Sequence, residues 1–250
     1  MWDWKDASLL LVGHGSSSYP AAADDLQRLA GQIRDRALFD RVDVAFWRQD
    51  PFISDACLQG ARIFVLPYFA GVGKHTEQLI PEILGLTGTM TVRTGQQILY
   101  CPPIGCHPRL PDLILRRALA TTAAPRETAL LLIAHGSSQG GASRTPEAIA
   151  ECLRTKEVFA EIVTVYLEQS PFAAEWPSLV KARQIVAQPL LLAAGMHVSD
   201  DIPPLFGMTA QSSSPADCHG FRIWLRQGIG EDSEIVAMLL DQVALAGEFT

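Results

Sequence analysis

The sequence has 250 residues, of which 48% are hydrophobic and 19% are charged, so it can bury one large core or two of ordinary size and is too apolar for a disordered chain. Acidic residues outnumber basic residues by 27 to 20, and the formal net charge of −7 argues against a general nucleic-acid binder. The longest apolar runs, such as 129–134, are too short to span a membrane and the first residues lack a signal-peptide pattern, so we expect a soluble, cytoplasmic protein.

The first half of the chain alternates short apolar runs with amphipathic stretches. A compact apolar run over 9–12 is typical of a strand buried on both faces. After it, Leu26, Leu29 and Ile33 recur at the spacing of a helix. Continued along this half, the patterns predict strands at 9–12, 42–46, 63–66 and 98–100, helices at 21–37, 76–84 and 109–119, and a short helix opened by Pro51.

The second half repeats this alternation. We expect strands at 130–133, 162–167, 184–192 and 221–225, with helices between them. Alternation of strands and helices is typical of a parallel sheet that helices cover on both faces. The sequence therefore predicts an α/β fold with two doubly wound parallel sheets.

Landmarks recur in the same order in both halves, which indicates a tandem duplication. The segment LLLVGHGSS around His14 resembles LLLIAHGSS around His135, which lies 121 residues later. His197 follows His75 by 122 residues, and a Gln-X-Pro-Phe motif returns after 120 residues. We expect two domains related by a pseudo-twofold axis, with boundaries at 1–124 and 125–250.

Four of the six histidines fall where predicted strands end. His14 and His135 follow the first strand of each half, and His75 and His197 follow the third. Doubly wound sheets bind ligands at the carboxyl ends of their strands, and strands one and three can be neighbours. We therefore expect the two histidines of a half to meet at one sheet edge, although a single histidine is more often a surface or core residue.

Two facing imidazoles can hold a divalent first-row metal without enclosing it, and they accept protons near neutral pH. Glu168, at the end of the second strand of the second half, could add a carboxylate or could be a solvated loop acid. Its counterpart in the first half is Arg48. The five cysteines form no CxxC pair, so we expect reduced and mostly buried thiols instead of a zinc site or a disulfide framework.

Two serines follow the first histidine of each half. Their amides and hydroxyls could bind an anion such as a carboxylate or phosphate, or they could cap the next helix. The residues concerned are Ser16, Ser17, Ser137 and Ser138.

Three segments of the second half, 132–138, 166–171 and 189–203, together resemble a known family, and the first half repeats the pattern in part. The chain resembles the ATP-independent, class II tetrapyrrole chelatases, specifically the two-domain form of the CbiX-type sirohydrochlorin cobaltochelatases and ferrochelatases. This resemblance implies an enzyme that inserts a divalent metal into sirohydrochlorin in cobalamin or sirohaem biosynthesis. Co²⁺ is the first expectation, with Fe²⁺ or Ni²⁺ as alternatives.

The resemblance also implies roles for the candidate residues. The metal, which is a substrate here, would be held by His135 and His197 in the second half and by His14 and His75 in the first. The same histidines would be catalytic together with Glu168, and either an imidazole or Glu168 would take up the pyrrole N–H protons.

The tetrapyrrole is expected in the cleft between the halves, with its carboxylates held by arginine side chains and strand-end amides. Lys74 and Arg144 are candidates from their position in the sequence. The dipeptide Trp47-Arg48 departs from the Leu-Glu of the family pattern, so the two halves differ at this point.

Two other functions compete with this one. A histidine phosphatase or mutase would need Arg immediately before the histidine, where this chain has Gly13 and Ala134. A non-catalytic metal or tetrapyrrole carrier derived from a chelatase stays open. No GxxxxGK[ST] motif occurs, so we expect no nucleotide, and neither nucleic acid nor membrane as a partner. An internal pseudo-dimer predicts a monomer or a weak homo-oligomer.

Overall fold

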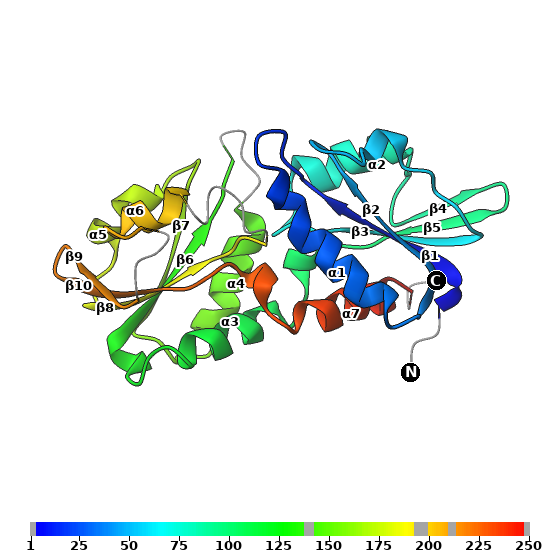
Figure 1. Ribbon diagram of the computed structural model, residues 1–250. Helices are drawn as coiled ribbons and strands as arrows, with labels where there is room; N and C mark the ends of the chain where they lie inside the picture. The colour runs from blue at the N-terminus through cyan, green and yellow to red at the C-terminus, as the bar shows by residue number, and fades with distance from the viewer. Residues whose placement is uncertain (1–3, 138–142, 193–199, 210–213, 248–250) are drawn as a thin grey trace. The chain divides into compact units, whose positions relative to one another are not determined.

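The computed structural model describes residues 4–137, 143–192, 200–209 and 214–247 (Figure 1). The strands of the first half are β1 (Trp4–Gly13), β2 (Phe39–Phe46), β3 (Arg62–Pro67), β4 (Met90–Arg93) and β5 (Gln96–Tyr100). Those of the second half are β6 (Thr128–Ala134), β7 (Glu161–Tyr166), β8 (Gln184–Pro189), β9 (Ala216–Cys218) and β10 (Phe221–Leu225). The α-helices are α1 (Asp24–Arg34), α2 (Ile80–Leu84), α3 (Leu110–Leu119), α4 (Arg144–Arg154), α5 (Trp176–Leu179), α6 (Ile202–Leu205) and α7 (Ile235–Gly247).

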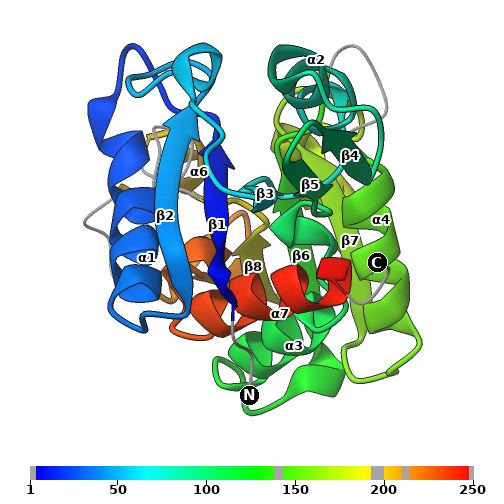
Figure 2. The same ribbon diagram turned by 90° about the vertical axis from the view of Figure 1, so that its right-hand side faces the viewer.

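The chain divides into two compact units. Unit 1 consists of Met1–His107 and Asp232–Thr250, and unit 2 consists of Pro108–Glu231. In unit 1 the strand order is β2-β1-β3-β5-β4 (Figure 2). All pairs are parallel except β4 with β5. β1 lies inside the sheet, and its last seven residues are all buried, as expected for a strand with a continuous apolar run.

Helices cover both faces of the unit 1 sheet (Figure 1). Leu10 and Val12 of β1 pack with Ile80 and Leu84 of α2 on one face. Alternate residues of a strand point to opposite faces, so Leu9 faces the other layer. That layer is made by α1 and α7, which contact each other as well as the sheet.

Unit 2 repeats the same design with the strand order β7-β6-β8-β10-β9. One face of its sheet packs on α5 and α6, and the largest fully buried side chain there is Trp176. The opposite face is covered by α4 and α3, which contact β6, β7 and β8. Only β9 and β10 pair antiparallel among the described strands of this unit.

The last helix of each sequence copy packs on the sheet of the other copy. The first copy ends with α3, which belongs to unit 2, and the second copy ends with α7, which belongs to unit 1. Within unit 2, Lys156 Nζ lies 2.8 Å from Asp112 Oδ1 of α3. Within unit 1, the Gln242 side chain of α7 donates to the carbonyl of Pro102 at 3.2 Å. The packing units and the sequence copies therefore have different boundaries.

The predicted fold class is confirmed, with a strand at each of the eight expected places. The prediction was incomplete at one edge of each sheet, where it missed the short antiparallel strands β4 and β9. The expected helix over 76–84 is also divided, because His75–Leu79 forms a π-helical turn before α2 begins. All five cysteines are free thiols, but only Cys101 is buried, so the expectation of mostly buried thiols was wrong. Within the part of the chain that the structure describes, no helix is long and apolar enough to cross a membrane.

Candidate functional site

The two histidines of the first half meet at the carboxyl edge of the unit 1 sheet. His14 directly follows β1, and His75 begins the π-helical turn that follows β3. β1 and β3 are neighbours, and the chain order of the sheet reverses between them. Ligands of doubly wound sheets bind at such a switch point. The ring centroids of His14 and His75 lie 5.1 Å apart at an interplanar angle of 72°.

Aromatic rings surround this histidine pair. The rings of Trp47 and His75 meet in an edge-to-face arrangement, with 4.6 Å between their centroids and an interplanar angle of 68°. The ring of Phe69 is stacked on the ring of His75, with 5.8 Å between the centroids and an interplanar angle of 21°. The guanidinium carbon of Arg48 lies 4.0 Å from the centroid of the Trp47 ring, which is a cation–π contact. Trp47 and Phe69 are half-buried, whereas His14 and Arg48 are exposed.

The π-helical turn holds His75 in place. Pro81 lacks an N–H group and cannot continue an ordinary helical hydrogen bond. The turn closes instead through the N–H of Ile80, which donates to the carbonyl of His75, five residues back. The hydroxyl of Tyr100 donates to the carbonyl of Thr76 at 2.6 Å. Burial raises the pKa of Tyr100 well above its usual range, so this donor stays protonated.

The equivalent edge of unit 2 carries a histidine and a carboxylate. His135 directly follows β6, and its Nδ1 lies 3.7 Å from Glu168 Oε2. The two side chains are 41% and 52% exposed, so both are accessible to a ligand. The amide of Glu168 donates to the carbonyl of His135 at 2.9 Å, which fixes the two backbones together. His197 lies outside the described residues.

The predicted serines lie in the loops that follow the two histidines. The amide of Ser16 donates to Gln49 Oε1 at 3.1 Å, and the hydroxyl of Ser16 accepts the amide of Tyr19 at 3.0 Å. Ser16 therefore closes a turn ahead of α1, and its amide is engaged by a side chain of the same unit. Ser17 is exposed.

In unit 2 the amide of Ser137 donates to Gln169 Oε1 at 2.9 Å in the same way. The glycine between His135 and Ser137, Gly136, has a φ of +77°, a conformation that favours glycine. Ser138 lies outside the described residues. No group of three or more His, Cys, Asp and Glu side chains that could hold a metal ion occurs among the described residues.

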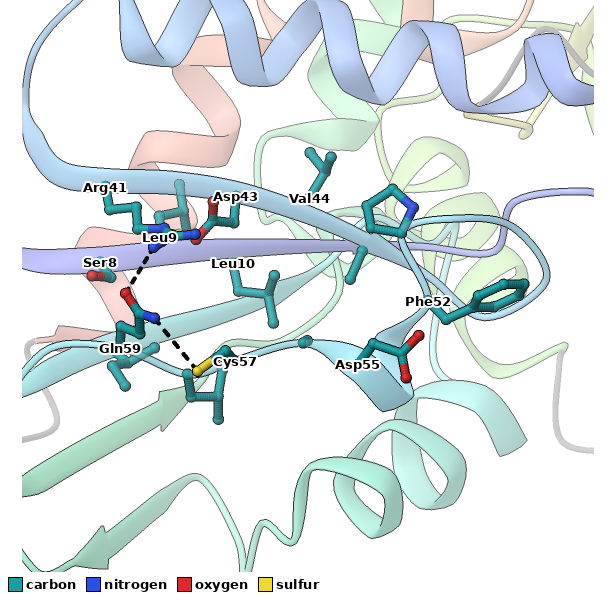
Figure 3. A pocket seen from close by; sticks show the side chains of 15 residues that line it. Ser8, Leu9, Leu10, Arg41, Asp43, Val44, Phe52, Asp55, Cys57 and Gln59 are labelled. Atoms are coloured by element: carbon teal, nitrogen blue, oxygen red, sulfur yellow. Dashed lines mark hydrogen bonds and ion pairs between the residues drawn. The ribbon is translucent and has the colours of Figure 1, made fainter.

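A cavity of about 260 Å³ opens elsewhere on unit 1 (Figure 3). Leu9, Leu10 and Ala56 line it together with Arg41, whose Nη1 donates to Gln59 Oε1 at 2.8 Å. None of the predicted site residues lines this cavity. At the repeat position of Ala56, unit 2 carries the buried indole of Trp176, so the second copy has a bulkier core here.

The sequence did not indicate the roles of four residues around the candidate sites. Gln49 and Gln169 were visible as members of the repeated Gln-X-Pro-Phe motif, but the motif alone does not reveal that their side chains accept a loop amide. Trp47 and Phe69 replace Leu167 and Leu191 of the second copy. The difference at Trp47 was visible in the sequence, and the same comparison at Phe69 shows that only the first half carries aromatic residues at both positions.

Comparisons with known proteins give one family. The chain is 28% identical to the probable sirohydrochlorin cobaltochelatase of Halobacterium salinarum, over 96% of this chain and 91% of that protein. It is 30% identical to the sirohydrochlorin ferrochelatase of Priestia megaterium, over 58% of this chain and 57% of that protein. A multi-domain protein of Deinococcus radiodurans, described as structurally similar to chelatases, superposes with a TM-score of 0.76 at 27% identity. That match covers 96% of this chain and 55% of the other.

The family model named CbiX matches the sequence twice. The matched residues are 8–121 and 129–246, which are the two copies that the internal repeat defines. Both copies contain the strand-end histidines described above, and together the two matches span most of the sequence. The chain therefore belongs to the CbiX family of chelatases.

Proposed function

We propose that the protein inserts Co²⁺ into sirohydrochlorin without a nucleotide, and that the second half carries the reaction. Family membership and the chelatase names of its relatives support metal insertion into sirohydrochlorin. The observation that carries the assignment to the second half is the contact between His135 and Glu168, 3.7 Å apart at the carboxyl edge of the unit 2 sheet.

The reaction needs a metal ligand and a proton acceptor at one place. The macrocycle loses two pyrrole N–H protons as its four nitrogens take up M²⁺, so each turnover releases two protons. A neutral imidazole binds a first-row metal through one nitrogen and leaves coordination positions open for the incoming pyrrole nitrogens. His135 would present the metal, with His197 as the proposed second ligand.

Glu168 supplies the negative charge that a histidine pair lacks. Its carboxylate would stabilise a divalent cation beside His135 and would accept a pyrrole proton as the metal moves into the macrocycle. Both side chains are about half exposed, so a planar substrate could reach them directly. The protonated acid could then pass its proton to water.

The proposed preference for Co²⁺ rests on the names of the relatives and not on the ligand chemistry. Imidazole and carboxylate ligands suit Co²⁺, Fe²⁺ and Ni²⁺ alike, so the ligand chemistry alone does not select among them. The relative that matches 96% of this chain is named a probable sirohydrochlorin cobaltochelatase, whereas the relative named a sirohydrochlorin ferrochelatase matches 58% of it. We expect Co²⁺ to give the highest kcat/KM, with Fe²⁺ and Ni²⁺ as slower substrates.

An anaerobic spectroscopic assay tests the proposal. Metal-free sirohydrochlorin is mixed with Co²⁺, Fe²⁺ or Ni²⁺ and with protein, in the absence of ATP, and the absorbance of the metallated product is followed. The double variant His135→Ala/His197→Ala should lower the rate by about 100-fold or more. His219→Asn is the matched control, since His219 lies on the β9–β10 turn with a φ of +52°, which Asn tolerates.

Two results would contradict the proposal. An unchanged rate in the double variant would exclude the second-half site. Stoichiometric binding of sirohydrochlorin without turnover by the unaltered protein would identify a carrier instead of an enzyme.

A further inference from the structure

The two copies carry opposite charges at one equivalent position. The amide of Arg48 donates to the carbonyl of His14 at 2.8 Å, and the amide of Glu168 makes the same bond to His135 at 2.9 Å. The backbones therefore match, but the side chains diverge. The Glu168 carboxylate lies near its histidine, whereas the Arg48 guanidinium lies over the ring of Trp47. Unit 1 thus has a permanent positive charge where unit 2 has a metal-compatible negative one.

This charge makes unit 1 a poor place for a divalent cation. Two neutral imidazoles would have to hold M²⁺ without a neutralising group, since no third His, Cys, Asp or Glu joins His14 and His75 among the described residues. The exposed guanidinium of Arg48, which follows the same sheet edge as His14, would repel the cation. The same arrangement attracts carboxylates.

The aromatic rings of unit 1 point to a planar ligand. Trp47 and Phe69 stand where unit 2 has Leu167 and Leu191, so the aromatic surface exists in one copy only. Both rings are half-exposed. Aromatic faces favour flat conjugated ligands, and a guanidinium stacked on an indole keeps its N–H donors in a plane that suits a carboxylate.

We propose that the His14–His75 site of unit 1 binds a planar polycarboxylate, the tetrapyrrole itself, and does not hold the metal. Arg48, held on Trp47, is the specificity-determining residue that takes a peripheral carboxylate. The identification of the ligand as the tetrapyrrole rests on the proposed function. The positive charge and the aromatic rings of the site are observed in unit 1 and do not depend on that function.

The experiment uses the full chain and separates binding from chemistry. Metal-free sirohydrochlorin is titrated into each variant and the Kd is read from fluorescence quenching, without any metal. Arg48→Gln should raise the Kd about tenfold or more, because a charge-assisted hydrogen bond is lost. Arg48→Lys should be intermediate, since the charge is kept but the planar fork is lost. Trp47→Leu, which copies unit 2, should also raise the Kd.

Steady-state kinetics and metal-binding stoichiometry distinguish a role of Arg48 in ligand binding from a merely structural role. Arg48→Gln should raise the KM for sirohydrochlorin by the same factor as the Kd and leave kcat unchanged. Arg48→Glu should add one Co²⁺ site per chain in calorimetry without tetrapyrrole. Arg36→Gln, an exposed arginine after α1, is the matched control and should change none of these values.

The failure of this inference differs from failure of the proposed function. A Kd and a KM that stay within about twofold in Arg48→Gln would overturn the role of Arg48. So would a variant in which kcat alone falls. If the unaltered protein inserts no metal, the proposed function fails, while the metal-free titration still tests Arg48. Equal Co²⁺ stoichiometry in Arg48→Glu and the unaltered protein would overturn the claim that charge excludes the metal from unit 1.

Discussion

The side-chain oxygen of Gln169 accepts the backbone N–H of Ser137 at 2.9 Å, and this bond fixes the loop that carries His135. Gly136 makes the loop possible, since a Cβ at this position would lie 2.8 Å from the Gln169 side chain. Gln49 and Ser16 repeat the bond in unit 1 at 3.1 Å. The Gln of the repeated motif therefore acts as a positioning residue for the first histidine.

Replacement of Gln169 by Leu should lower kcat for metal insertion while the protein stays folded. The Ser137 amide would lose its acceptor in a half-buried place, at a cost of about 1 kcal/mol in the free energy of unfolding. Gln169→Glu keeps an acceptor oxygen and should restore most of the activity. Steady-state kinetics and thermal unfolding measure the two effects, and equal kcat in Gln169→Leu and the unaltered protein would contradict the positioning role.

Replacement of Glu168 by Gln tests the proton acceptor proposed for the second half. The carboxylate is lost but the shape is kept, so kcat should fall about 100-fold, the lower end of general acid–base effects. Because the side chain is 52% exposed, the unfolding temperature should stay the same. Glu151→Gln, on the exposed face of α4, is the control. Full activity of Glu168→Gln would mean that another group takes the pyrrole protons.

The sequence predicted much of the fold because its strands are unusually clear. β1 and β6 are buried on both faces, so their apolar runs are continuous. The missed strand β4 is short and exposed, with Val92 71% exposed, and it has no apolar run. β4 could have been found from the hairpin turn that joins it to the predicted strand β5, where Gly95 has a φ of +75°.

The sequence predicted only those features of the candidate site that follow from the order of the strands in the sheet. The proximity of His14 and His75 follows from neighbouring strands one and three. The stacking of Arg48 on Trp47 depends on side-chain conformation, which no spacing reveals. The exchange of α3 and α7 was also hidden, because an amphipathic pattern predicts a helix without identifying the sheet that it covers.

The exchanged helices predict that residues 1–124 do not fold as a monomer. This fragment lacks α7, whose buried Ile235, Leu239 and Val243 cover the unit 1 sheet. It also carries α3 without the unit 2 sheet on which that helix packs. Coexpression with residues 125–250 should restore a folded complex. Size-exclusion chromatography with light scattering and thermal unfolding provide the test, and a cooperatively melting monomer of 1–124 would contradict the prediction.

Trp176 should be the most costly single truncation in unit 2. Its side chain is 1% exposed, and its Nε1 donates to the carbonyl of Leu205 at 2.9 Å. Trp176→Ala leaves a large cavity and removes this bond, so the free energy of unfolding should fall by about 3–5 kcal/mol. Phe172→Ala, at a position 46% exposed, is the control and should cost far less. Urea unfolding of both variants gives the comparison.

The ion pair between Asp112 of α3 and Lys156 predicts a pH-dependent contribution to stability. The hydrogen bond from Lys156 lowers the pKa of Asp112, and the same bond raises the pKa of Lys156. The Asp112 contribution is therefore present above the usual carboxyl pKa of about 4 and is lost as the pH falls through the lower folded value. The Lys156 contribution is complete below about pH 10 and is lost as the pH rises through the raised folded value.

Between these limits Asp112→Asn should lower the unfolding temperature by about 2 °C or less, because the pair is exposed to solvent. The difference from the unaltered protein should be constant near neutral pH and should disappear in strong acid, where Asp112 is protonated. Lys156→Gln should give the same difference at neutral pH, and the double variant should lose no more than either single one. Additive effects of the two substitutions would show that Asp112 and Lys156 do not interact and would remove this link between α3 and the segment that follows α4.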